Sequence, residues 1–238
     1  MLRGENLLTR SLLLTLSLFG ATGVTAVAQS GPSAIPRPAW VGDGVSDTVW
    51  VLIEAALAES DKNRTKTMLK EAEAEARSAI AGREGESGHR FALAVVLGLR
   101  TEREGGKTKI AIAADLKKEL EATLAIDPAH ARARHLRGRL NAAVLRMSSI
   151  TRWLATSVLG GGELKKASWQ QAESDLVFAE LEVPGVSDHH MQLANLYRDT
   201  KRPDLARAEV EHVLAMPFRS TMETAVHNEA LKLKKKLR

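Results

Sequence analysis

Gly105, Gly106, Lys107 and Thr108 form the glycine-rich segment best suited to phosphate chemistry. A phosphate-binding loop also needs a glycine five residues before Gly106 and a strand leading into the loop. Thr101 occupies that position, and the sequence before it predicts no strand. We therefore interpret the segment as a turn between two helices and expect no bound nucleotide.

Seven histidines could supply metal ligands, but their spacing does not favour a site. His189 and His190 are adjacent, so on a helix they point about 100° apart. His130 and His135 are five residues apart, whereas a spacing of four would place both on one helical face. No cysteine is present to complete a zinc site. We interpret the histidines as solvated or helix-capping side chains and expect no metal ion and no other cofactor.

The sequence also lacks the patterns of a hydrolase. No Gly-x-Ser-x-Gly segment occurs, and carboxylate pairs such as Glu73 and Glu75 belong to a charged helix. The absence of cysteine excludes disulfides, thiolate metal sites and a thiol nucleophile. We expect that the protein is not an enzyme, and a hydrolase hidden in a groove is the alternative left open.

The first residues have the pattern of an export signal. Arg3 and Arg10 precede an uncharged apolar run over residues 11–28, which ends in the small residues Ala26 and Ala28. We predict cleavage before Gln29 and a periplasmic or secreted protein. An uncleaved inner-membrane anchor is the alternative. Residues 29–45 contain three prolines and are interpreted as an extended linker.

Helical periodicity continues over most of the remaining chain, and no convincing strand is present. Helix starts are predicted at Asp127-Pro128, Ser168 and Ser220, and helix ends at Gly105-Gly106, residues 160–162 and Pro184-Gly185. Aromatic residues make up only 4% of the chain, which disfavours a β-sandwich or barrel. The composition therefore predicts an all-α fold.

Small and apolar residues recur at an interval of 34 residues. The spacing of Ala172, Leu176 and Ala179 is repeated by the set Ala206, Val210 and Val213, shortly after Leu193, Ala194 and Tyr197. This arrangement resembles the tetratricopeptide repeat, a helix–turn–helix unit in which small residues let helices approach closely. Gly138 falls where an earlier repeat requires a small residue, but Arg137 and Asn141 replace large apolar residues there.

A more specific resemblance extends over residues 89–233. A lysine-rich helix (GGKTKIAIAADLKKELEATLAIDP) is followed by HLRGRL, an inserted helix bearing Trp153, a glycine turn, ASWQQAESDL and NEALKL. This order resembles the bacterial relatives of the regulator of microtubule dynamics family, which consist of divergent tetratricopeptide repeats. The resemblance implies a right-handed superhelical solenoid over residues 46–220, capped by a C-terminal helix over residues 221–238. We do not carry over tubulin association, because an exported protein would not meet microtubules.

The resemblance also implies a binding groove lined by the first helices of the repeats. The residues that match groove positions are Arg132, His135, Arg139, Met191, Asn195 and Arg198. The first three form one basic stripe, which would favour an acidic or C-terminal peptide segment. The alternative is an ordinary solvated face of an arginine-rich helix.

We therefore expect an exported adaptor that binds another protein in the cell envelope, and no nucleic-acid partner. The alternative is a protein of the membrane surface. In that case the inserted helix, with Ile150, Trp153, Leu154 and Val158 on one face, would dock on lipid together with the basic tail 232–238.

Overall fold

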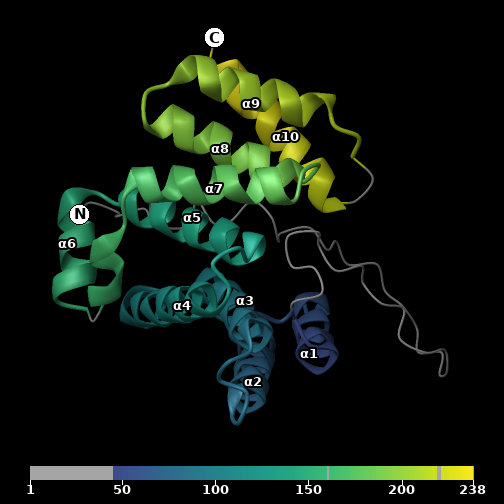
Figure 1. The fold of residues 1–238 in the computed structure, drawn as a ribbon, viewed down its shortest axis with the longest axis vertical. Coiled ribbons are helices and arrows are strands. Elements are labelled where there is room, and N and C mark those ends of the chain that lie inside the picture. Colours follow the sequence, from purple (N-terminus) through teal and green to yellow (C-terminus); the bar gives the residue numbers. More distant parts are fainter. Residues whose placement is uncertain (1–44, 160, 219–220, 238) are drawn as a thin grey trace.

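The described part of the chain is all-α in a computed structural model that describes residues 45–159, 161–218 and 221–237 (Figure 1). Within these ranges it contains ten α-helices, one short 3-10 helix and no strand. They are α1 (Asp47–Ala58), α2 (Lys62–Ile80), α3 (Ser87–Arg103), α4 (Gly106–Ile126), α5 (Ala131–Leu145), α6 (Ser149–Ser157), η3 (Gly162–Lys166), α7 (Trp169–Glu182), α8 (Ser187–Asp199), α9 (Pro203–Ala215) and α10 (Thr221–Lys236).

Several predictions concern residues outside the described ranges. The export signal over residues 1–28, the linker up to residue 44 and the helix start at Ser220 belong to this group. Among the helices that the structure describes, none combines the length and the apolar character needed to cross a bilayer.

Each helix packs mainly against its neighbours in the sequence. The longest interfaces join α3 to α4, α5 to α7, and α8 to α9, so these six helices form three consecutive hairpins. Helices α6 and η3 form an insertion between α5 and α7. They contact each other, and η3 also contacts α4. Figure 1 shows α6 at the side of the molecule, with α1–α4 below α5 and α7–α10 above it.

Local capping chemistry sets the helix starts. The predicted start at Asp127 is wrong, because Asp127 follows the last turn of α4 and His130 caps α5, accepting a backbone N–H at Nδ1. The predicted start at Ser168 is confirmed, and its hydroxyl oxygen accepts the N–H of Gln171 at 3.1 Å. The Gln171 side-chain NH2 group donates to Asp175 at 3.1 Å.

The residues predicted to pack between helices are buried. Ala172, Leu176 and Ala179 of α7 and Ala206, Val210 and Val213 of α9 are at most 2% exposed. Gly138 of α5 lies so close to α7 that a Cβ atom there would be 2.8 Å from Leu176 Cγ and 3.0 Å from the carbonyl oxygen of Ala172. The small residues therefore permit close helix approach, as the spacing predicted.

Helix α10 covers one side of the α8–α9 hairpin. Its residues Val226, Ala230 and Leu233 are buried against Met191 and Val210, among other apolar side chains of α8 and α9. Helix α10 thus completes the last apolar cluster of the chain's described part.

Candidate functional site

Two of the six predicted groove residues, His135 and Arg139, contact one buried carboxylate, Asp188 at the start of α8. His135 Nε2 lies 3.0 Å from Asp188 Oδ2, and Arg139 Nη1 lies 3.4 Å from the same oxygen. Gln192 donates to the other oxygen at 3.0 Å. His135 and Arg139 of α5 therefore turn toward α8, and Asn195 lies about two turns along α8 from Asp188.

The remaining predicted residues are placed differently. Met191 is wholly buried in the apolar cluster beneath α10, so it is a core residue and lines no surface. Arg132 and Arg198 stay partly exposed, and Arg198 pairs with its neighbour Asp199 at 2.7 Å. The predicted basic stripe is therefore mostly compensated, because Asp188 binds Arg139 and His135 from inside the fold.

The charges around Asp188 stabilise its ionised form. Burial opposes that form, but the charge of Arg139 and the hydrogen bonds from His135 and Gln192 outweigh it and hold the pKa of the carboxyl well below its usual range. Burial lowers the pKa of His135 despite the neighbouring carboxylate, so the imidazole is neutral near pH 7. The pair is thus a neutral histidine that donates to an ionised aspartate, with the positive charge supplied by Arg139.

Two further carboxyl groups lie within electrostatic reach of Arg139. Glu102, in the last turn of α3, is almost fully buried, and burial raises its pKa to about 7 against the opposing charge of Arg139. Glu229 of α10 accepts a hydrogen bond from Asn195 Nδ2 at 3.1 Å, yet burial and the charge of Asp188 raise its pKa. The proximity of these two carboxyl groups to Arg139 could not be predicted from their spacing in the sequence.

We call this set the Asp188 cluster. Its members come from α3, α5, α8 and α10, and they are Glu102, His135, Arg139, Asp188, Asn195 and Glu229. The helices α3, α5 and α8 are each the first helix of a hairpin, and α10 follows the last hairpin. The cluster therefore links successive units along one side of the fold.

A buried imidazole pair borders the Asp188 cluster. The rings of His135 and His189 lie 4.5 Å apart, and both side chains are at most 1% exposed. Burial lowers the pKa of His189 to about 3. The prediction that the histidines are solvated or cap helices is therefore wrong for these two, although His130 does cap α5.

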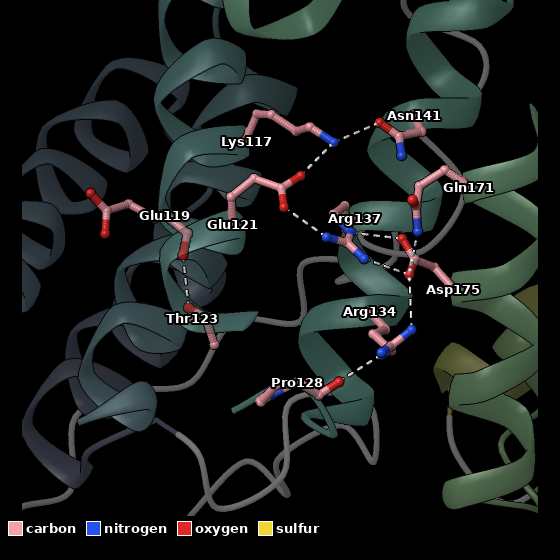
Figure 2. A network of polar contacts seen from close by, with 10 residues as sticks. All are labelled: Lys117, Glu119, Glu121, Thr123, Pro128, Arg134, Arg137, Asn141, Gln171 and Asp175. Atoms are coloured by element: carbon pink, nitrogen blue, oxygen red, sulfur yellow. Dashed lines mark hydrogen bonds and ion pairs between the residues drawn. The ribbon is translucent and has the colours of Figure 1, made fainter. Parts of the chain in front are cut away.

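A second polar network, which the sequence did not predict, crosses the opposite side of α5 (Figure 2). Asp175 of α7 is fully buried and accepts two bonds from Arg137, at 2.7 Å from Nε and 2.8 Å from Nη2. Arg137 Nη1 donates to Glu121 of α4 at 2.7 Å. Buried Lys117 lies between Glu121, at 2.9 Å, and Asn141 of α5, at 3.0 Å.

This Asp175 network explains two exceptions in the repeat pattern. Arg137 and Asn141 occupy positions where the pattern prefers large apolar residues, and both face polar partners on α4 or α7. Buried charges are tolerated when they are paired and hydrogen-bonded, as the bidentate Arg137–Asp175 pair is. The network therefore replaces apolar packing where α4, α5 and α7 meet.

Comparison with known proteins identifies one family. A family model described as regulator of microtubule dynamics protein 1-3 matches residues 48–238. No curated protein matches the chain.

Proposed function

Because the chain belongs to the regulator of microtubule dynamics protein 1-3 family, we propose that it is a binding protein: an exported adaptor that holds another protein of the cell envelope. The proposal includes a right-handed superhelical solenoid of tetratricopeptide-like repeats, with the partner on the side of the first helices. The microtubule association in the family's name is not extended to this chain, since an exported protein would not meet microtubules.

Three consecutive hairpins support the solenoid part of the proposal. The spacing of 34 residues relates Ala172, Leu176 and Ala179 to the corresponding residues of α9, and all are buried where helices touch. Stacked hairpins of this kind present their first helices along one extended surface. The inserted α6 separates the two helices of the middle hairpin without interrupting their contact.

The binding proposal rests on which helices contribute residues to the Asp188 cluster. All its members lie on the first helices of hairpins or on α10, so the polar residues of four separate segments meet on one side. Arg132 and Arg198 lie on two of the same helices and stay partly exposed. We propose that these two arginines contact the partner, while His135 and Arg139 fix α5 against α8 beneath them.

Because Arg139 is part of the buried cluster, the binding surface is tested at Arg132 and Arg198. Reversing Arg139 would leave Asp188 buried beside a new carboxylate and would damage the fold. We therefore propose the double variant Arg132→Glu with Arg198→Glu, and a charge-matched control, Arg64→Glu with Arg207→Glu. Arg64 and Arg207 are exposed on α2 and α9.

The experiment is affinity capture from native envelope extract, with quantitative mass spectrometry of each variant. The proposal predicts a defined protein that is captured by the wild type and by the control, and is depleted at least about tenfold with Arg132→Glu and Arg198→Glu, which corresponds to about 1.4 kcal/mol. Equal capture by both double variants would reject this surface.

A membrane-surface role is the second candidate, and one observation favours it. Ile150, Trp153, Leu154 and Val158 are between 41% and 81% exposed, although they share one face of the inserted α6 segment. A helix with such a face can lie at a lipid interface, aided by nearby basic residues. The basic C-terminal residues Lys235 and Lys236 are exposed as well.

Vesicle flotation separates this candidate from the adaptor. Docking predicts that wild-type protein floats with anionic vesicles and that Ile150→Ser with Trp153→Ser abolishes flotation. Leu205→Ser is the matched control, because Leu205 is an exposed apolar residue on α9. The tail is tested by changing Lys235 and Lys236 to Gln, since deletion of residues 232–238 would also remove buried Leu233. Failure of the wild type to float would reject lipid docking.

A further inference from the structure

Two histidines and a glutamate meet where α8 packs against α9. His190 Nδ1 of α8 lies 2.7 Å from Glu209 Oε2 of α9. His212, one turn further along α9, has its Nδ1 atom 3.8 Å from the same oxygen. One potential ligand atom from each of the three side chains lies within 4.8 Å of the others.

We propose that His190, Glu209 and His212 form a zinc-binding site that joins α8 to α9. The proposal is independent of the adaptor function. It also differs from the sequence-based expectation that the protein holds no metal, which rested on pairs of histidines close in sequence.

The fold supplies the geometry that those pairs lack. Glu209 and His212 are three residues apart on α9, so they share one helical face, as Glu-x-x-His ligands do in helical bundles. His190 comes from the adjacent helix and points at the same place, with its ring centroid 5.2 Å from that of His212. The ligands therefore come from two elements whose spacing is already fixed by apolar packing.

The two separations measured from Glu209 Oε2 bracket the distance that zinc requires. Zinc–nitrogen and zinc–oxygen bonds of about 2.0–2.2 Å place the ligand atoms of a tetrahedral site about 3.3 Å apart. The separations of 2.7 Å and 3.8 Å lie on either side of that value. His212 is 64% exposed, so its side chain can adjust and a hydrated ion can reach it.

Glu180 of α7 provides an outer partner. Its Oε1 atom lies 3.9 Å from His190 Nε2, the ring nitrogen that would stay free when Nδ1 binds the ion. This separation is about 1 Å longer than a hydrogen bond, so a small rotation of the Glu180 side chain would let it accept a hydrogen bond from Nε2–H. Outer carboxylates fix the orientation of ligand imidazoles in zinc sites in this way. The three protein ligands leave a fourth position for water.

The donor set favours zinc over the common hard cations. Calcium and magnesium prefer oxygen ligands, whereas two of the three donors here are imidazole nitrogens. One carboxylate and two neutral imidazoles suit a divalent ion of intermediate softness.

The test is calorimetric titration of ZnCl₂ into the full-length protein after chelator treatment, at about pH 8 because the ligands must be deprotonated. Wild type is expected to bind one ion. His212→Ala should weaken binding by more than the roughly 10- to 100-fold that loss of an outer partner costs, and Glu180→Gln should weaken it within that range. His89→Ala, which removes a histidine of α3, should leave the affinity unchanged.

Loss of zinc binding can be distinguished from unfolding. His212 is largely exposed, so His212→Ala should keep the circular dichroism spectrum of the wild type. Visible absorption of bound cobalt gives a second readout, since tetrahedral coordination has intense bands that His212→Ala would remove. No binding by the wild type overturns the proposal. Binding that persists in His212→Ala, or that falls equally in His89→Ala, also overturns it.

Discussion

We expect the Asp175 network to make a large contribution to the stability of the fold. Asp175→Asn keeps the shape of the side chain but removes the charge that faces Arg137, which now donates to Asp175 from two nitrogens at 2.7 Å and 2.8 Å. Asp175 is fully buried, and the Arg137 side chain is only 12% exposed, so water cannot replace the lost partner. Arg134 and Gln171 also point at this carboxylate, at 3.6 Å and 3.1 Å.

Breaking a buried ion pair from one side costs about 3–5 kcal/mol. Arg137 keeps Glu121 as a second partner, so we expect the lower end, about 3 kcal/mol of unfolding free energy. For a chain of this size, that corresponds to a melting temperature lower by about 6–12 °C.

The assay is urea and thermal unfolding followed by circular dichroism at pH 7. Asp204→Asn is the control, because Asp204 pairs with Arg207 but its side chain is 88% exposed. Its melting temperature should stay within about 2 °C of the wild type. Replacing both members of the buried pair, by Arg137→Met with Asp175→Leu, should cost less than Asp175→Asn alone. An Asp175→Asn protein as stable as the Asp204→Asn control would refute the reasoning.

Four other substitutions test the packing and the buried titratable groups. Gly138→Ala should lower the unfolding free energy by about 1–3 kcal/mol, because its Cβ atom would crowd Leu176. Gly98→Ala should raise the unfolding free energy by up to about 1 kcal/mol, because a Cβ atom there would lie 3.9 Å from its nearest neighbour, Leu136 Cδ1. The midpoints of urea unfolding measure both changes. Glu102 has a folded pKa of about 7, so its contribution to stability is complete below about pH 4.5 and is lost as the pH rises through 7. Glu102→Gln should therefore be more stable than the wild type at pH 8, by up to about 3 kcal/mol, and an unchanged slope of stability between pH 5 and 8 would contradict this. His189 has a folded pKa of about 3, so its contribution to stability is present above about pH 6.5 and is lost as the pH falls toward 3. His189→Phe should therefore lose less unfolding free energy than the wild type between pH 6.5 and 4. An equal loss in the two proteins would contradict this.

The helical packing could be predicted from the sequence because it depends on a repeated spacing. Gaps of four and three residues place Ala172, Leu176 and Ala179 on one face of a helix, and the same gaps recur 34 residues later. Gly138 was identified by its position relative to that pattern, and its close contact with α7 confirms the reasoning.

The polar clusters could not be predicted in the same way. Arg137 is paired with a residue 38 positions away, and His135 with a residue 53 positions away. Sequence spacing reports which residues share a helix face, but it does not report which charges meet across helices. An arginine-rich helix such as α5 was therefore interpreted as a solvated or ligand-binding face, whereas much of its charge is bound inside the fold.

The histidines show the same limit. Spacing along one helix argued against His130 with His135 as a metal pair, and in the structure His130 caps α5 while His135 contacts Asp188. It could not reveal that His190 and His212 approach each other from two helices. One signal was available, the Glu-x-x-His spacing of Glu209 and His212 on a predicted helix.

Site-directed photocrosslinking tests the binding proposal most directly. The chain has no cysteine, so Arg198→Cys and Asp204→Cys each provide a unique position for a photoreactive maleimide. These positions lie on α8 and α9, the first and second helices of one hairpin. A binding surface on the first helices predicts that position 198 yields a defined protein adduct in intact envelopes and that position 204 does not. The same adduct from both positions, or adducts with lipid alone, would contradict it.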